Sequence, residues 1–235
     1  MRQILRWGVV SAVTAALLGS AAWAGNWPAV RQVSFSADNR RVLVLTGYVQ
    51  DGSGFPQAAL HLLDTGTGRT LFQQVRRSED TSVTPSALLG QLLRTQASRL
   101  KAAGINPARS NRPRYLGPQP TFPQWTDALQ SGQSRTQPVF LWSRPVPFVL
   151  KVQRVAAPCA YPGLLPEGEG PATFHLSVNG QVIAAPRAPA VPCAARYLLD
   201  RVDLSGNRVL VTLRAYGPGF EGPEATPVFV AATLH

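Results

Sequence analysis

Apolar and polar positions alternate in short runs along most of this chain, which is typical of β-strands joined by turns. Gly, Pro, Asn and Asp separate the runs, and these residues favour turns. Residues 42–45 are continuously apolar, which indicates a strand buried on both faces. Asn179-Gly180 between two apolar triplets predicts a hairpin. The predicted strands cover residues 30–35, 41–49, 58–63, 69–75, 139–142, 148–155, 173–183, 196–202, 208–216 and 228–234.

One helix is clearly indicated between Thr84 and Gly104. Thr84 is a favourable N-cap, Pro85 fits the first helical position, and Gly104 fits a left-handed helix end. We expect the apolar face of this helix to cover the protein's own sheet. The predicted fold class is mainly β (β-rich α+β), with antiparallel meander or sandwich-like sheets and one packed amphipathic helix. That apolar face repeats at helical spacing through Leu89, Leu92, Leu93, Ala97 and Leu100.

Residues 41–56 and 208–223 share one order of features. Each has an apolar strand, a tyrosine, a glycine-rich loop with a phenylalanine, and a proline that leads into another strand. Two copies are too few for a solenoid or a propeller. We therefore expect two related glycine-loop hairpins within one domain. The aromatic residues at matching places are Tyr48 and Phe55 in the first copy and Tyr216 and Phe220 in the second.

These motifs also carry a resemblance. Residues 35–40 and 62–68 look like one blade of a β-propeller, and residues 51–56 read Asp-Gly-Ser-Gly-Phe-Pro. Together with residues 219–223, they make the chain similar to a bacterial family of predicted secreted proteins of unknown function. The resemblance implies export. It supplies no catalytic residues, because none is established for that family.

The N-terminus has the three parts of a secretory signal peptide. Arg2 and Arg6 give a positive start, residues 7–18 are apolar, and Ala-Trp-Ala precedes Gly25. The predicted signal peptide is therefore 1–24. No later apolar run approaches the roughly 20 residues that cross a bilayer, so we expect no transmembrane segment after cleavage. The predicted location is periplasmic or extracellular.

The rest of the chain, 25–235, is predicted to be a single β-rich secreted domain. A segment rich in Pro, Arg and Asn, 106–123, is a possible subdomain boundary. Cys159 and Cys193 are the two cysteines of the sequence. Because an even pair in an exported protein indicates a disulfide, we expect these two residues to be bonded to each other.

The formal net charge is +11, and removal of Arg2 and Arg6 leaves +9 (11 − 2). Such a charge favours contact with anionic partners. The basic residues are scattered along the sequence, however, which indicates a diffuse basic surface more than a dedicated polyanion site. No specific nucleic-acid site is evident.

Signals for catalysis are weak. Ser53 lies in Asp-Gly-Ser-Gly and not in the Gly-x-Ser-x-Gly turn of a hydrolase nucleophile. His61 and His175 lie on predicted strands, and we interpret both as structural. The acidic pairs at 79–80 and 167–169 are in polar stretches where a desolvated catalytic carboxylate is not expected. We predict no metal and no cofactor.

Glycine-rich loops on rigid hairpins are common binding positions, so residues 51–56 are the first place to expect a ligand. The competing interpretation is that the aromatic residues seal each hairpin against the core. The predicted function is that of an exported, non-enzymatic binding or envelope-associated protein, whose partner is an envelope protein or an anionic polymer. The alternatives are a polyanion-binding module and a hydrolase with an unrecognised site. The candidate ligand-binding residues are Tyr48, Asp51, Ser53, Phe55, Tyr216 and Phe220.

Overall fold

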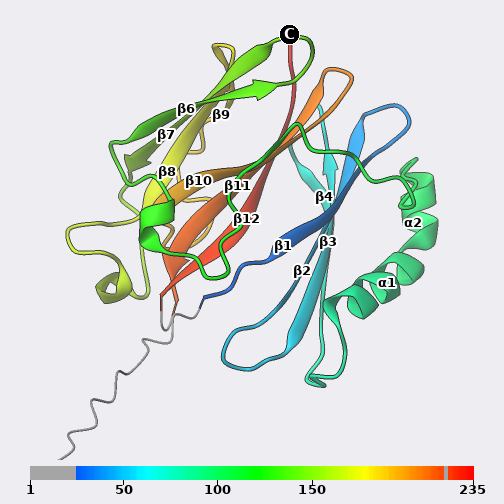
Figure 1. Ribbon diagram of the computed structural model, residues 1–235, viewed down its shortest axis with the longest axis horizontal. Helices are drawn as coiled ribbons and strands as arrows, with labels where there is room; N and C mark the ends of the chain where they lie inside the picture. Colours follow the sequence, from blue (N-terminus) through cyan, green and yellow to red (C-terminus); the bar gives the residue numbers. More distant parts are fainter. Residues whose placement is uncertain (1–24, 220–221) are drawn as a thin grey trace, which may run out of the picture.

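The computed structural model describes residues 25–219 and 222–235. These residues form three antiparallel four-stranded sheets, which we call sheets A, B and C, and two helices (Figure 1). The helices cover one face of sheet A, sheet B lies against the other face, and sheet C covers the far side of sheet B. The prediction of a β-rich fold with antiparallel sheets is confirmed.

Sheet A has the order β1-β2-β3-β4. Side chains alternate between the two faces of a strand, and both faces of this sheet are covered. The even-numbered residues Val42 and Val44 pack toward sheet B, while Leu43 and Leu45 pack beneath the helices. This double burial explains the continuous apolar run in β2. The strands are β1 (Ala29–Phe35), β2 (Arg41–Val49), β3 (Pro56–Asp64) and β4 (Thr70–Arg77).

The predicted helix is divided into α1 (Pro85–Thr95) and α2 (Ala97–Ala102). The predicted N-cap is confirmed, because the Ala87 N–H donates to Thr84 Oγ1 at 3.2 Å. The break falls at Gln96, whose backbone angles (φ −101°, ψ 11°) depart from those of a helix and whose side-chain amide donates to the Gln74 side chain of β4 at 2.7 Å. No helix in residues 25–219 or 222–235 is long and apolar enough to cross a membrane.

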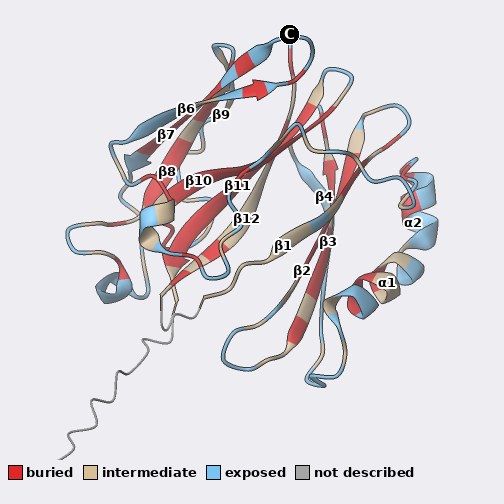
Figure 2. Ribbon diagram, in the orientation of Figure 1, coloured by how far each residue is buried: buried red, intermediate tan, exposed pale blue. Residues whose placement is uncertain are grey.

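Sheet B is the central layer and has the order β12-β11-β10-β5. Its two long middle strands are buried along almost their whole length (Figure 2). The β11–β12 hairpin and the β2–β3 hairpin are the two predicted related hairpins, and each closes on a proline that pairs across its loop. The strands are β5 (Tyr115–Leu116), β10 (Arg196–Ser205), β11 (Arg208–Pro218) and β12 (Pro223–Thr233).

Sheet C packs on the outer face of sheet B and has the order β6-β7-β8-β9. Phe148, Leu150 and Phe174 are among its residues in the largest apolar cluster of the protein. Two short 3-10 helices, Trp125–Asp127 and Pro162–Leu164, lie in the connections. The strands are β6 (Ser134–Phe140), β7 (Pro145–Arg154), β8 (Ala172–Val178) and β9 (Gln181–Ala184).

The segment 106–123 contacts both sheets A and B. The Asn111 N–H donates to the Val33 carbonyl of β1 at 2.7 Å, and the Arg114 N–H donates to the Val202 carbonyl of β10 at 2.7 Å. A short strand within this segment, β5, then joins the edge of sheet B. The segment therefore links two layers through its backbone.

The central sheet contains a buried ion pair. The Arg214 side chain is fully buried, and its Nε donates to an Asp200 carboxylate oxygen at 2.8 Å. Burial lowers the pKa of the Arg214 guanidinium, and the Asp200 carboxylate opposes that shift. Arg214 also donates to the Pro28 carbonyl at 2.6 Å, and its guanidinium lies 4.4 Å from the centre of the Trp27 ring. The pair thus fixes the segment that leads into β1.

We expect Asp200→Ala to lower the free energy of unfolding by about 3–5 kcal/mol, because the charge of Arg214 would stay buried without its counter-ion. Chemical denaturation measures the loss. Glu167→Ala, at an exposed carboxylate, is the control and should change stability by less than about 0.5 kcal/mol. Equal effects of the two substitutions would contradict a structural role for the pair. Replacing both Asp200 and Arg214 with apolar residues of similar volume should recover much of the loss.

Candidate functional site

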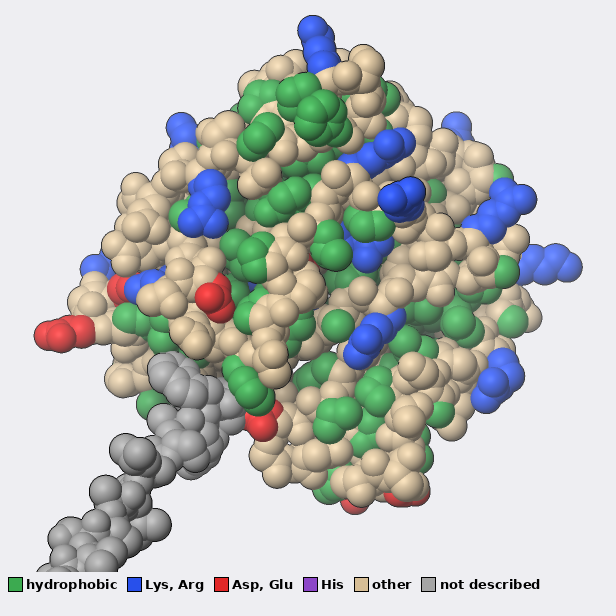
Figure 3. All heavy atoms as spheres, viewed as in Figure 1, with side chains coloured by type: hydrophobic (Ala, Val, Ile, Leu, Met, Phe, Trp, Pro, Cys, Tyr) green, Lys and Arg blue, Asp and Glu red, His purple; other side chains and the backbone are tan. Residues whose placement is uncertain are grey.

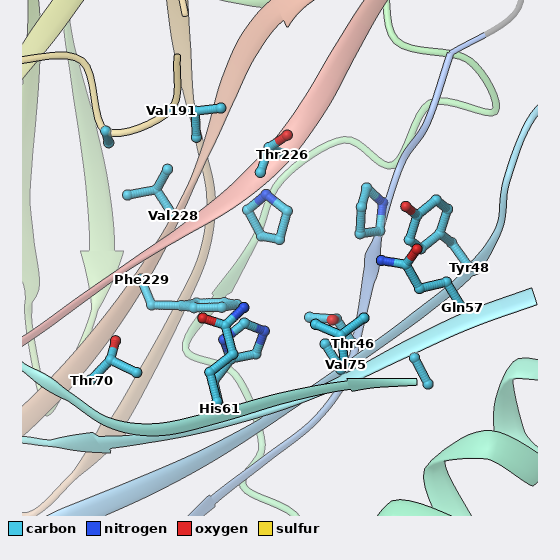
Figure 4. A pocket seen from close by; sticks show the side chains of 16 residues that line it. Thr46, Tyr48, Gln57, His61, Thr70, Val75, Val191, Thr226, Val228 and Phe229 are labelled. Atoms are coloured by element: carbon cyan, nitrogen blue, oxygen red, sulfur yellow. The ribbon is translucent and has the colours of Figure 1, made fainter. Parts of the chain in front are cut away.

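A groove of about 430 Å³ lies between sheets A and B, where β3 and β4 diverge from β12 (Figure 4). We call it the intersheet groove. β4 is the edge strand of sheet A and β12 is the edge strand of sheet B, so the groove lies at the free edges of both sheets. The backbone segment at Ala190 and Val191 forms a further wall, and Pro28 closes part of the floor.

The polar side chains that line the intersheet groove are all uncharged at neutral pH. His61 is neutral because its pKa is lowered to about 4. No Asp, Glu, Lys or Arg is among the lining residues of the groove. Hydroxyl and amide groups both donate and accept hydrogen bonds. The groove therefore fits an uncharged polar ligand better than an ion. These polar residues are Thr46, Tyr48, Gln57, His61, Thr70, Gln73 and Thr226.

His61 lies near the middle of the groove and comes from β3. Phe229 of β12 lies over its ring in an edge-to-face arrangement, with centroids 5.0 Å apart (Figure 4). Burial disfavours the imidazolium and lowers the pKa of His61 to about 4. Its neutral ring can donate one hydrogen bond and accept another.

Tyr48 and Gln57 lie together at one end of the groove, on neighbouring strands (Figure 4). The Gln50 side-chain amide donates to the side-chain oxygen Oε1 of Gln57 at 3.3 Å, which orients the Gln57 amide. Burial raises the pKa of Tyr48, so its hydroxyl keeps its proton at any physiological pH. This end of the groove can therefore offer a hydroxyl and an amide to a ligand.

The two ends of the groove are held by specific contacts between the sheets. At one end, a Cβ on Gly68 would lie 2.9 Å from the Ala231 carbonyl oxygen, so only glycine permits this close approach of the two backbones. At the other end, Asn26 accepts from the Asp51 N–H at 3.0 Å and donates to Glu224 at 2.7 Å. The intersheet groove is thus fixed in length by the turn before β4 and by the Asn26 bridge.

The Ala190–Val191 wall is fixed from sheets B and C. The Ala190 N–H donates to the Tyr197 hydroxyl at 3.2 Å, and that hydroxyl donates to the Ala172 carbonyl at 3.0 Å. Cys159 and Cys193 form the predicted disulfide, which closes a loop across 34 positions next to this wall. The bond ties the segment that follows Val191 to the loop between β7 and β8.

The structure separates the predicted ligand-binding residues. Tyr48 lines the intersheet groove. Asp51 and Ser53 are exposed on the loop beyond its end, and Phe55 lies under Arg77, whose guanidinium is 5.0 Å from the ring centre. These three residues are near the groove but are not part of its lining.

In the second hairpin, Tyr216 lies away from the lining of the intersheet groove. Tyr216 is fully buried in a small cluster with Leu198 and Ala225, so it seals the core. Burial raises the pKa of its hydroxyl. Phe220 lies outside the described residues.

The two rings at the centre of the groove, His61 and Phe229, are not among the ligand-binding residues predicted from the sequence. His61 lies on an apolar strand, which favoured a structural interpretation. The one available signal was a polar residue within the apolar run of β3. Phe229 gave no signal, because it belongs to a strand 168 positions away along the chain.

Within the part of the chain that the structure describes, no three His, Cys, Asp or Glu residues are grouped to hold a metal ion. His175 is on β8, far from the groove lining, and its buried Nδ1 has no partner among the described residues. Lys and Arg side chains are spread across the face in Figure 3 and do not form one cluster there.

Comparison with known proteins identifies the family of the chain. A family model described as "Predicted secreted protein (DUF2259)" matches residues 44–233, which is most of the chain and includes every residue that lines the groove except Pro28. No curated protein matches the sequence.

We expect the titration of His61 to make stability depend on pH. Between pH 6.5 and about 4, the unfolded chain binds a proton at His61 and the folded chain does not, so acidification favours unfolding. The loss should reach about 3 kcal/mol near pH 4 and be absent above pH 7. His61→Gln should lack this component. The unfolding free energies of the wild type and of His61→Gln are measured from pH 4 to 8, and their difference separates the contribution of His61 from that of the carboxylates. A difference that is constant with pH would contradict the expectation.

Proposed function

Because the chain belongs to the DUF2259 family of predicted secreted proteins, we propose that it acts outside the cytoplasm as a non-enzymatic binding protein whose ligand site is the intersheet groove. The periplasm or the extracellular space is the site of action. One observation carries this proposal: a groove of about 430 Å³ lined by uncharged hydrogen-bonding groups and two aromatic rings, with no charged residue in its lining.

The chemistry of the groove supports binding more than catalysis. General acid–base catalysis needs a group whose pKa lies near the working pH, and the pKa of His61 is lowered to about 4. Among the described residues, no carboxylate forms an ion pair with His61 that would orient it or raise its basicity. A neutral imidazole beside hydroxyls and amides can instead hold a polar ligand in one orientation.

The rigidity of the groove also supports binding. Its wall is held by the Tyr197 hydroxyl and the disulfide, and its ends are held by Gly68 and Asn26. A site that is already formed loses little conformational entropy when a ligand binds. The groove therefore has the properties of a preorganised site.

The test uses a substitution that fills the groove. Gln73 lines the groove from β4, so Gln73→Trp should abolish retention of envelope components by the immobilised exported protein. Leu71 is on the same strand, is 51% exposed and does not line the groove, so Leu71→Trp is the matched control. We expect Leu71→Trp to retain the same components as the wild type, at both low and high salt.

Equal retention by both variants would exclude the intersheet groove as the site. If the retained material were polyanionic and lost at high salt, binding would come from the basic surface, because that interaction is screened by ions. Retention that survives high salt and is lost only in Gln73→Trp supports the proposal.

A further inference from the structure

We propose that the ligand of the intersheet groove is an extended polypeptide segment that pairs, as a fifth strand, with the free edge of β4. The segment is uncharged where it passes His61 and carries an acidic residue where it meets Arg77. This inference rests on the proposed function, because it names the ligand class of the same groove.

The backbone of β4 has free hydrogen-bonding groups on its outer edge. The Ser78 N–H donates to the Pro56 carbonyl at 3.1 Å, which fixes the alternation of the antiparallel β3–β4 ladder. Residues 72, 74 and 76 therefore direct their N–H and C=O groups toward β3. Gln73, Val75 and Arg77 direct theirs outward, away from the sheet.

The same three residues have their side chains on the groove face. Val75 pairs with Ala59 and Gln73 pairs with His61, so their side chains share the face of sheet A that lines the groove. Side chains of a strand alternate between its faces. Every second side chain of a strand added to β4 would therefore point into the intersheet groove, toward β12.

The opposite edge of the groove is protected against strand addition. In the β11–β12 ladder, the Leu234 N–H donates to the Asn207 carbonyl. Because hydrogen-bonded pairs alternate along an antiparallel ladder, the odd-numbered residues of β12 direct their backbone N–H and C=O groups away from β11. The Ala225 N–H already donates to the Asn26 carbonyl at 3.0 Å, and Pro227 has no N–H. Proline on an outward position is a common protection of a sheet edge.

The other edges are protected as well. The Asn111 N–H bonds to the outer edge of β1, and β6 presents Pro138 outward. The two remaining edge strands are short, since β9 has four residues and β5 has two. By contrast, β4 has eight residues and no proline, and none of its outward backbone groups has a backbone partner among the described residues. A long open edge without such protection is a ready template for another strand.

Charge selects the kind of strand. β4 carries Arg76 and Arg77 and no acidic residue. Arg76 donates to Gln91 of α1 on the helix side, whereas Arg77 is on the groove side and forms no ion pair with any described residue. An acidic residue opposite Arg77 would gain a cross-strand pair. A second copy of this chain would bring the same arginines and the same net positive charge, which opposes self-pairing.

The test begins with an array of immobilised octapeptides that have uncharged centres and either an acidic, a neutral or a basic end, probed with the labelled exported protein. We expect binding to the octapeptides with acidic ends. The affinity of the tightest one is then measured for Val75→Pro, which removes one outward N–H and leaves the bonds of residues 74 and 76 to β3. Val75→Pro should weaken it by at least about tenfold.

Val182→Pro is the matched control. Val182 is also an exposed valine on an edge strand, β9, and is 54% exposed against 48% for Val75. In this hairpin, Val178 and Gln181 flank the Asn179-Gly180 turn as a hydrogen-bonded pair. Val182 is the next residue along β9, so its N–H points away from β8, as that of Val75 points away from β3. We expect unchanged affinity in this variant. Because Val75→Pro could unfold locally, the wild-type protein is also tested with octapeptides in which single amides are replaced by esters, and affinity should fall at alternate positions only.

The outcomes separate this inference from the proposed function. Binding that is lost in Val75→Pro, kept in Val182→Pro and sensitive to esters at alternate positions supports strand addition. Loss of retention in Gln73→Trp, together with no octapeptide binding and full retention in Val75→Pro, would overturn it and leave the groove as a site for another ligand. A dimer that dissociates in Val75→Pro would also overturn it, in favour of pairing between two copies of the chain.

Discussion

The buried pair of Arg214 and Asp200 in the central sheet is the interaction on which the rest of the arrangement depends. Sheet B is covered on both faces, so any charge within it must be paired inside the protein. Arg214 meets this requirement and at the same time holds the Pro28 carbonyl and the Trp27 ring. The backbone that follows becomes β1, and Asn26 just before it bridges β12 to the glycine-rich loop. Packing of the central layer therefore determines where the end of the groove lies.

The intersheet groove results from sheets that are packed at one side and spread at the other. Apolar residues close the space between β1, β2 and the middle of sheet B, whereas the edge strands β4 and β12 remain apart. The close backbone contact at Gly68 and the Asn26 bridge set this separation without filling it. The space is lined by polar residues, because groups at an open edge keep contact with water and need no internal partner. Its shape is thus a consequence of strand edges and not of a dedicated loop.

Local patterns predicted what local interactions determine. The N-cap at Thr84 and the two hairpins follow from neighbours in sequence. The continuous apolar run of β2 indicated burial on both faces but not which elements cover them. The stacking of three sheets does not, because it depends on pairs of surfaces far apart in the chain. Tyr48 and Tyr216 show the difference: the same position in the same motif lines a groove in one hairpin and is buried in the other. The position of His61 in the groove could not be predicted either, because the ring that lies over it, Phe229, belongs to a distant strand.

An open strand edge exposes a protein to aggregation, and three of the longer edges here are covered or carry an outward proline. On β4, protection comes from charge alone, through arginines near one end of the strand. Charge protects against a second copy, which carries the same charge, but not against a segment of opposite charge. Proline would exclude both. Of the two strand edges that border the groove, β12 therefore carries proline and β4 carries arginine, so β4 opposes pairing with a second copy of the chain but does not oppose a segment of opposite charge.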